Sequence, residues 1–529
     1  MARCAGRLRR LWGALACVVL ACGLAACGGG GGGGGSAPPT GGGTPPTESA
    51  HLLAEFVAQD SNHQFVRVWD PAQPDVAIEN VQITVSNGIV WTSSHLVFSD
   101  AAQYDAATHT MTALGHARVF YDNNGSLFTI DLRGGQSHAP VQLSSAIDVF
   151  TTVNVFPMSA DGADAWVDVQ GGSHDWAIRS TMTATDTPFA VRAIVGALRD
   201  PTSGLPQYFF TSKGSQSGTV ITPTTFQIVD TTFSPVTQPV VSTMSSEDAW
   251  LGVDPAQDGL GYLKVGTQLR ALHWSAGAVS VDTADLYDFN DPLGSVPAVA
   301  DANALYLTDG TRLLAAANGA VRLVGSFSTL PTALVEAGAY IAASEDGSAL
   351  PVSTQVEALS KAAGTVALIE PATAGLQVLG ASAQAIVIVG TPEAGQAFLL
   401  ASGDNEVRQT AGSQFVGLVR PASHLLDQPG VPVALLSCTA AATSGYCAPG
   451  PLLQLDITTP GNATTLGALA ATSAWMRDDL TAGLTSSFAG QTFLATPAGF
   501  GADEVDARDA WQVTAGTAGS LARVTSNLP

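Results

Sequence analysis

From about residue 51 onward, short runs of Val, Ile, Leu, Phe and Tyr alternate with Gly, Asp, Asn, Ser and Pro. Apolar runs of this kind, bounded by turn-forming residues, are typical of β-strands. The clearest unit spans 117–132, where two apolar runs flank Asn124-Gly125. Asn-Gly tolerates the positive φ angles of a tight hairpin turn. The pattern predicts an all-β body of repeated antiparallel hairpins.

One apolar anchor can be assigned to each successive hairpin. The anchors are Phe120, Trp166, Phe209, Tyr262, Tyr306, Tyr340, Ile388, Leu435 and Phe493. Their spacing averages about 47 residues, and propeller repeats run roughly 40–50 residues with four strands each. We therefore predict a β-propeller of seven or eight four-stranded blades over 51–529. The first strand is expected to complete the last blade. Tandem β-sandwiches and a β-helix remain alternatives.

The N-terminal residues 1–26 have the layout of an export signal. A basic start precedes an apolar segment at 11–23, which is shorter than the ~20 residues that span a bilayer. The basic residues are Arg3, Arg7, Arg9 and Arg10. Next comes Leu24-Ala25-Ala26-Cys27, which resembles the lipobox of bacterial lipoproteins. The resemblance implies cleavage before Cys27, lipidation of its sulfur and anchoring in a membrane. An ordinary secretory signal with a coincidental Cys is the alternative.

Residues 27–50 carry no apolar run that can be buried. Eight consecutive Gly fill 28–35, and Gly, Pro, Thr and Ser dominate the rest. Such a chain is a flexible tether with a reach of ~25–30 Å. In Gram-negative lipoproteins an Asp after the lipidated Cys favours the inner membrane, and here that position is Gly28. The resemblance therefore implies the outer membrane of a Gram-negative envelope.

The balance of acidic and basic residues limits the kinds of molecule that this protein can bind. Lys and Arg together number 21 against 44 Asp and Glu, for a formal net charge of −23. Phosphate contacts need basic residues, so the composition excludes a nucleic-acid-binding protein. The acidic residues are spread along the chain, which favours a solvated exported protein over a dedicated acidic docking site.

Two cysteines remain in the body, Cys438 and Cys447. An isolated pair in an exported protein predicts a disulfide, which here would close a short loop. The alternative is a metal or redox pair. The spacing is not Cys-x-x-Cys and no His flanks it, so the disulfide is favoured.

An oxygen-rich segment is the one candidate cofactor site. Its members are Asp285, Asp288, Asn290 and Asp291. Ca²⁺ binds six to eight oxygens, so a structural calcium ion is a hypothesis for this segment. The spacing lacks the Gly and terminal Glu of an EF-hand. A solvated turn, with no cofactor, is the preferred interpretation.

Two short segments resemble turns of known propellers. They are Ser159-Ala160-Asp161-Gly162 and Ser344-Glu345-Asp346-Gly347, and both resemble the Ser-x-Asp-Gly turn of TolB-like propellers. Residues 130–134 share a fragment of the repeat in the propeller lipoprotein of the outer-membrane barrel assembly machinery. These resemblances imply a propeller, and we transfer no functional residue from either family.

Known catalytic signatures are missing from the sequence. It contains no Gly-x-Ser-x-Gly elbow, no phosphate loop and no His-Glu-x-x-His. We therefore expect a non-enzymatic binding or scaffold protein whose partner is an envelope protein or a glycan. The alternative is an envelope enzyme that acts on glycans or peptides at the propeller funnel. His273-Trp274 and His174-Asp175-Trp176 are candidates for sugar stacking, although a core position is preferred for their Trp rings.

Overall fold

The computed structural model describes residues between 52 and 523, with gaps. The longest continuous stretches are 126–144, 152–171, 192–217, 220–234, 248–290, 296–345 and 353–381. The regular elements in this part of the chain are all β-strands. Within it, no helix has the length and hydropathy needed to cross a membrane.

The strands before residue 231 form five antiparallel sheets. The first holds β1 (Leu53–Ala58), β2 (Gln64–Trp69), β3 (Ala77–Ile83) and β4 (Leu96–Phe98). The next two hold β5 (Gln103–Asp105) with β6 (Thr110–Ala113), and β7 (Arg118–Asp122) with β8 (Leu127–Asp131) and β9 (Val141–Ser144). The fourth holds β10 (Thr152–Pro157), β11 (Ala165–Gly171), β12 (His174–Ser180) and β13 (Phe189–Ala190). The fifth holds β14 (Arg192–Arg199), β15 (Pro206–Ser217) and β16 (Val220–Asp230).

Three sheets follow in the middle of the chain. One holds β17 (Ala249–Val253), β18 (Leu260–Val265), β19 (Gln268–Ser275) and β20 (Ala278–Val281), with β21 (Tyr287–Asp288) paired to β19. The next holds β22 (Ala298–Ala300), β23 (Leu305–Asp309), β24 (Arg312–Ala317) and β25 (Ala320–Ser326). The third has seven strands: β26 (Pro331–Ala337), β27 (Tyr340–Glu345), β28 (Ser353–Ser360), β29 (Val366–Ala381), β30 (Ala385–Val389), β31 (Ala397–Ala401) and β32 (Val407–Gln409).

Two further sheets end the described chain. One holds β33 (Ser413–Val419), β34 (Ala434–Ala440), β35 (Tyr446–Asp456) and β36 (Ala463–Leu469), with β37 (Ser473–Ala474) paired to β35. The last holds β38 (Thr485–Phe488), β39 (Gln491–Ala495), β40 (Ala510–Thr514) and β41 (Ala522–Arg523).

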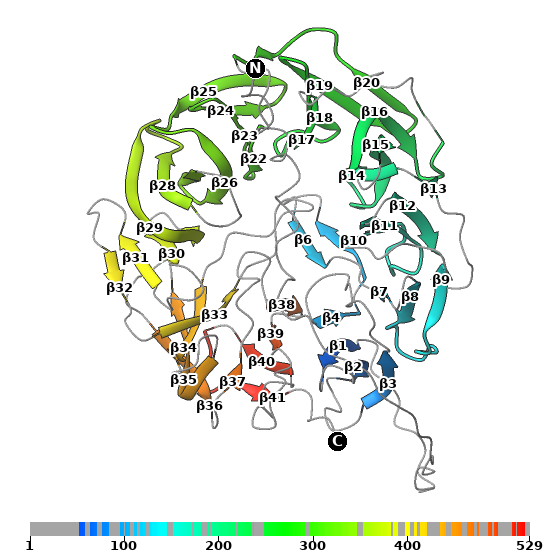
Figure 1. Ribbon diagram of the computed structural model, residues 1–529, viewed down its shortest axis with the longest axis vertical. Helices are drawn as coiled ribbons and strands as arrows, with labels where there is room; N and C mark the ends of the chain where they lie inside the picture. The colour runs from blue at the N-terminus through cyan, green and yellow to red at the C-terminus, as the bar shows by residue number, and fades with distance from the viewer. Residues whose placement is uncertain are drawn as a thin grey trace, which may run out of the picture.

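The sheets follow one another in chain order around a ring (Figure 1). The first sheet lies beside the last, because β4 contacts β38 and β39. This radial arrangement of consecutive antiparallel sheets confirms the predicted all-β propeller. Seven or eight four-stranded blades were expected; the hydrogen-bonded sheets of the described residues number ten and range from two to seven strands.

The expected closure by the first strand is wrong for the described residues. Strand β1 pairs with β2 and β4 in a sheet of its own. The last described sheet consists of β38–β41 alone. The seven-stranded sheet arises because the first part of β29 pairs with β28 and its second part pairs with β30. One long strand therefore serves two neighbouring ladders.

Hydrophobic cores lie between consecutive sheets. Successive side chains on a strand point to opposite faces, so each sheet presents one apolar set to each neighbour. Phe210 and Ile228, for example, pack with Leu263 and Leu272 of the next sheet. Each such fully buried side chain contributes roughly 1.5–3 kcal/mol of transfer free energy. Comparable cores, each shared by two neighbouring sheets, continue around the ring from the first sheet to the sheet that contains β27 and β28. This packing holds the turns of adjacent sheets at fixed separations.

Candidate functional site at the turn end of the sheets

Several charged residues with well-defined contacts gather at one end of the sheets. In an antiparallel four-stranded sheet, the turn between the first and second strands lies at the same end as the turn between the third and fourth. We call this end of the molecule the turn end. It includes the β10–β11, β14–β15, β17–β18 and β22–β23 turns, which contain or begin with Asp161, Asp200, Asp254 and Asp301.

Each of these four aspartates caps its own turn. The Oδ1 atom accepts a hydrogen bond from the backbone N–H two residues later, at 2.7–3.1 Å. Asp suits this position because its short carboxylate reaches the nearby backbone. The hydroxyl of Ser159 and the N–H of Ser203 are the largest causes that lower the pKa of Asp161 and of Asp200 respectively. The carboxylates of Asp161 and Asp200 therefore stay charged to a lower pH than a free aspartate would.

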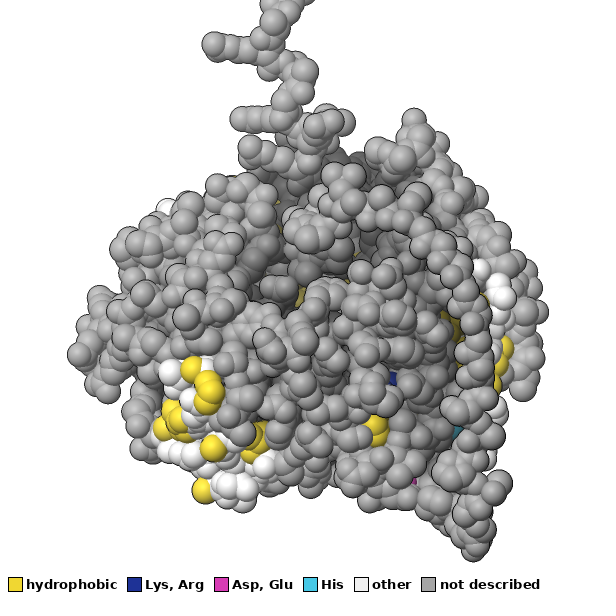
Figure 2. Space-filling view, turned by 60° about the horizontal axis from the view of Figure 1, so that its bottom comes forward, with side chains coloured by type: hydrophobic (Ala, Val, Ile, Leu, Met, Phe, Trp, Pro, Cys, Tyr) yellow, Lys and Arg dark blue, Asp and Glu magenta, His cyan; other side chains and the backbone are white. Residues whose placement is uncertain are grey.

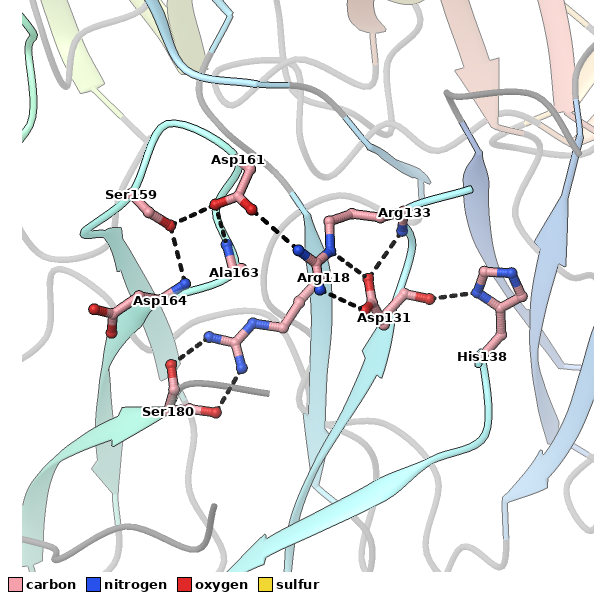
Figure 3. Close-up of polar contacts among 9 residues, drawn as sticks. All are labelled: Arg118, Asp131, Arg133, His138, Ser159, Asp161, Ala163, Asp164 and Ser180. Carbon is pink, nitrogen blue, oxygen red and sulfur yellow. Dashed lines mark hydrogen bonds and ion pairs between the residues drawn. The ribbon is translucent and has the colours of Figure 1, made fainter. Parts of the chain in front are cut away.

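The β10–β11 turn shows why the sequence Ser159-Ala160-Asp161-Gly162 is suited to it (Figure 3). The Ser159 hydroxyl donates to Asp161 Oδ1 at 2.7 Å and accepts the N–H of Asp164 at 3.1 Å. The N–H of Gly162 donates to the Ser159 carbonyl, and Gly162 adopts φ +66°. A side chain would be strained at that φ, so glycine fits here. Every residue type of the motif has a structural role in the turn.

Arg133 joins this turn to the preceding sheet (Figure 3). Its Nη1 donates to Asp161 Oδ2 at 3.0 Å, while Nε and Nη2 donate to the two oxygens of Asp131 at 3.1 and 3.0 Å. The hydrogen bond with Asp131 is the largest cause of the raised pKa of Arg133. The Asp161 side chain is 56% exposed, so its ion pair adds at most about 1 kcal/mol. The contact orients the turn more than it stabilises it.

A buried arginine beneath this network ties two strands together. Arg118 on β7 donates to the hydroxyl of Ser180 on β12 at 2.5 Å and to its carbonyl at 2.7 Å. Its guanidinium lies 5.0 Å from the Phe120 ring centroid. Nearby, His138 Nδ1 lies 2.6 Å from the Asp131 carbonyl oxygen (Figure 3). The Arg118 bonds fix β7 relative to β12, and the His138 contact holds the loop after β8 against the end of that strand.

A second ionic cluster bridges the sheets that begin with β22 and β26. Lys361 Nζ lies 2.7 Å from Asp301 Oδ2 and 2.7 Å from Glu336 Oε1. All three side chains are at least 86% buried. The Tyr306 hydroxyl donates to Asp301 Oδ2 at 3.1 Å, and its ring lies 5.3 Å from Lys361 Nζ. Lys361, in the β28–β29 turn, therefore joins the β22–β23 turn and the end of β26 through one ammonium group.

The chemistry open to this cluster follows from its protonation. Burial alone would raise the pKa of Asp301, but the hydrogen bond and charge of Lys361 outweigh burial and lower it. A glycosidase needs two facing carboxyls, one of which is a protonated acid. Here one lysine occupies the space between the two carboxylates, and Asp301 is held as an anion. The geometry supports an ionic clasp rather than acid–base catalysis.

Tyrosine hydroxyls make further links between neighbouring sheets. Tyr208 on β15 accepts the N–H of Gly277 in the β19–β20 turn at 2.7 Å. Tyr262 on β18 accepts the N–H of Gly319 in the β24–β25 turn at 3.3 Å and donates to Asp254. Tyr262, one of the apolar anchors of the predicted repeat, thus also has a polar role that the anchor pattern did not predict. The sequence pattern that could have predicted this role is an Asp at the start of a turn with a Tyr eight residues after it.

The predicted calcium segment is described except for Asp291, which lies outside the described residues. Asp285 pairs with Arg270 at 3.0 Å, and Asp288 is exposed at the end of β21. The Asn290 side-chain amide donates to Asp309 Oδ2 at 2.6 Å. In the part of the chain that the structure describes, no three His, Cys, Asp or Glu residues gather as a metal site would require. The calcium site stays a prediction.

The predicted disulfide cysteines lie on adjacent strands. Cys438 belongs to β34 and Cys447 to β35, with Ala440 opposite Cys447 in the register. Cys438 is buried. The neighbouring strands are compatible with the bridge, which stays a prediction. Cys27 and the rest of 1–51 lie outside the described residues, as do Asp346 and Gly347 of the second Ser-x-Asp-Gly segment.

Of the aromatic candidates, Trp274 belongs to the core. Its side chain packs between the sheets that contain β15 and β18, and its Nε1 donates to the Arg199 carbonyl at 3.1 Å. His273 faces outward and lies 3.2 Å from Asp282. The core interpretation of Trp274 is therefore confirmed. His174 and Trp176 lie on β12, where only their backbone pairing is described.

Neither a family model nor a curated protein matches the chain. Among solved structures, apo AztD from Citrobacter koseri is 11% identical, covers 72% of this chain and 97% of its own length, and has a TM-score of 0.33. A structure described as the eukaryotic initiation factor is 9% identical, covers 80% and 97%, and has a TM-score of 0.40. The Cps50 (Swd1) β-propeller domain of Myceliophteria thermophila is 9% identical, covers 61% and 99%, and scores 0.30. The propeller assignment rests on the arrangement of the sheets, and function has to be argued from this chain.

Proposed function

We propose that this protein is a lipid-anchored envelope protein whose propeller binds or scaffolds a partner without catalysing a reaction. The observation that supports this most is the turn end, where charged and hydroxyl groups of neighbouring sheets bond to one another. Arg133 with Asp161, and Lys361 with Asp301, are such links. They make a frame whose surface is organised before a partner arrives, which lowers the entropic cost of binding.

Anchoring is part of the same proposal and rests on the sequence. Leu24-Ala25-Ala26-Cys27 supplies the lipidation site, and 28–50 supplies a tether of ~25–30 Å. Acyl chains on Cys27 would hold the protein stably at a membrane. Because Gly28 follows Cys27, we place it in the outer membrane of a Gram-negative cell. The partner is then an envelope protein or a glycan within reach of the tether.

An envelope enzyme acting on glycans or peptides at the propeller funnel is the competing function. It requires ionisable groups that converge on an open site and are not already paired. Two mostly buried carboxylates of the described chain, Asp301 and Glu336, share the ammonium of Lys361. This pairing favours the binding function.

The decisive experiment is photo-crosslinking in the native envelope followed by capture through a tag placed after Pro529. The matched control is Cys27→Ala, which should be exported but released from the membrane. We expect one stoichiometric protein partner, captured by the anchored protein and lost from the control. A folded, anchored protein that captures nothing would contradict the scaffold function and favour the enzyme, to be tested with glycan and peptide substrates.

A further inference from the structure

Among the described residues, one patch on the outside of the ring contains no ionisable residue although the chain is strongly acidic. It consists of the outer part of β35, of β36, and of the loop 516–521. We call it the neutral face, and its exposed residues are Pro449, Pro451, Ala463, Thr465, Ala468, Gly516, Thr517, Ala518 and Gly519. No ionisable residue occurs in 448–454, 463–468 or 516–521. Figure 2 shows hydrophobic side chains (yellow) among other side chains and backbone (white) on this side.

The neutral face is a fixed surface because the loop is bonded to both strands. The N–H of Gly516 donates to Gln454 Oε1 at 2.9 Å, and the N–H of Gly519 donates to the Thr465 carbonyl at 3.1 Å. Leu521 donates its N–H to the Leu466 carbonyl at 2.9 Å. Two adjacent sheets therefore form one continuous neutral surface.

The position of this surface relative to the N-terminus identifies what it faces. Strand β1 begins at Leu53, directly after the tether, and its sheet contacts the sheet of β38 through β4. Strand β38 in turn contacts β33, in the sheet that contains β35 and β36. Figure 1 shows these three sheets side by side. Only the sheet of β38 therefore separates the sheet that carries the neutral face from the sheet of β1, the first strand after the tether.

Charge decides which side of a tethered body approaches an anionic membrane. The formal net charge of −23 becomes more negative when the signal with its four Arg is removed. Anionic lipid attracts each basic residue near its surface, and it repels each carboxylate to a similar degree within a Debye length of ~8 Å. The tether already keeps the body near the membrane. The side of the body that turns toward the membrane therefore needs only to be the side that the anionic lipid repels least.

We propose that the neutral face lies against the phospholipid surface that holds the lipidated Cys27. The proposal rests on the lipid anchoring proposed above. The face has no basic residue and no described large aromatic side chain, so it orients the body without anchoring it. The charged turns with Asp161, Asp200 and Asp254 are thereby left toward the aqueous space, where a partner can reach them.

Lipidated full-length protein in vesicles of phosphatidylethanolamine and phosphatidylglycerol tests this orientation. A single fluorescent amino acid replaces Ala468 on the neutral face, or Ala278 on β20 at the opposite side of the ring as the matched control. Lipids with a headgroup quencher report contact with the membrane. We expect stronger quenching at 468 than at 278. With the label at 468, Thr465→Glu should lower about fivefold the ratio of molecules whose neutral face contacts the membrane to molecules in which it does not. The neutral change Thr465→Gln should leave this ratio unchanged.

The arms of the experiment separate its causes. The difference in quenching between positions 468 and 278 should become smaller in phosphatidylcholine vesicles, which carry no net charge. It should also become smaller at 1 M salt, where the Debye length falls to ~3 Å. Protein that does not float with the vesicles contradicts the lipid anchoring itself. Protein that floats but shows equal quenching at 468 and 278, or stronger quenching at 278, overturns the orientation while leaving the anchoring intact. A thermal melt of each variant checks that the fold is retained.

Discussion

Ionic residues at the turn end have consequences that differ with their exposure. Arg133 and Asp161 are partly exposed, so their pair is screened by water and salt. Lys361, Asp301 and Glu336 are mostly buried, and each carboxylate depends on the one ammonium. Removing a partner from a buried cluster costs far more than removing one from a surface pair. The Lys361 clasp is therefore the more informative place for mutation.

Lys361→Met should destabilise the protein by about 3–5 kcal/mol, because it leaves two mostly buried carboxylates without their cation. Chemical denaturation of the purified body measures the free energy of unfolding. Adding Glu336→Gln to Lys361→Met should recover part of the loss, since one unpaired charge is removed. A double variant no more stable than Lys361→Met, together with a small effect of Lys361→Met alone, would contradict the clasp.

Acid should weaken the fold through the capping aspartates. The pKa of Asp161, Asp200 and Asp301 is lowered in the folded protein. A carboxyl with a lower pKa when folded contributes stability above its unfolded pKa of ~3.9, and this is lost as pH falls through the folded value. The free energy of unfolding should therefore decline below about pH 4. In urea titrations at several pH values, Asp301→Asn should show a shallower decline; an unchanged slope would exclude Asp301 as a contributor.

At the scale of strands and turns, neighbouring sheets approach so closely that some positions admit only glycine. The backbone of Gly325 on β25 faces that of Gly364 in the β28–β29 turn, and a Cβ on either residue would meet backbone atoms of the other segment. The backbone cannot move aside as a flexible side chain would. This contact lies beside the Lys361 clasp, in the same β28–β29 turn.

Gly325→Ala should cost at least about 1–3 kcal/mol, because overpacking there forces two backbones apart. The matched control is Gly266→Ala in the β18–β19 turn, where nothing lies within 4 Å of an added Cβ but φ is +60°. The control carries only the left-handed backbone cost of ~1–2 kcal/mol. Thermal denaturation compares the two variants. A Gly325→Ala protein as stable as wild type would exclude the close approach.

Much of the strand content follows from the sequence, for identifiable reasons. Alternating apolar runs and an Asn-Gly turn predict β7 and β8, and each of the nine apolar anchors lies on a different strand. Which strands share a sheet could not be predicted, because β29 is one continuous run that pairs on both sides. The clasp was missed because Asp301, Glu336 and Lys361 are far apart in sequence. Their meeting depends on how two sheets pack, which no local pattern encodes.

At the scale of the whole molecule, the negative net charge opposes compaction. A formal charge of −23 with few basic residues produces self-repulsion that screening relieves. Charged residues still meet opposite charges where sheets join, as at Arg133 and Lys361. Salt weakens both the long-range repulsion, which destabilises the fold, and the short-range ion pairs, which stabilise it. Because 44 acidic residues outnumber 21 basic ones, the weaker repulsion determines the net effect of salt on stability.

Salt should therefore stabilise the folded body. Raising NaCl from about 20 to 300 mM shortens the Debye length from roughly 20 Å to under 10 Å, and the melting temperature should rise. Calorimetry on the Cys27→Ala protein measures this without a membrane. Sodium chloride and potassium chloride should act alike, because screening depends on ionic strength. A melting temperature that falls with salt would show that ion pairs outweigh the net repulsion.

The burial of Lys361 also affects which chemical reagents can detect the protein. The chain has three lysines; Lys264 is 1% exposed, and the Lys361 side chain is 14% exposed and held between two carboxylates. Acylation of Cys27 would remove the terminal amine as well. Formaldehyde fixation, succinimide esters and amine-coupled sensor chips would then find few reactive amines on the protein. Interaction surveys that rely on primary amines would pass over this protein, whereas diazirine or carboxyl-directed reagents would capture it.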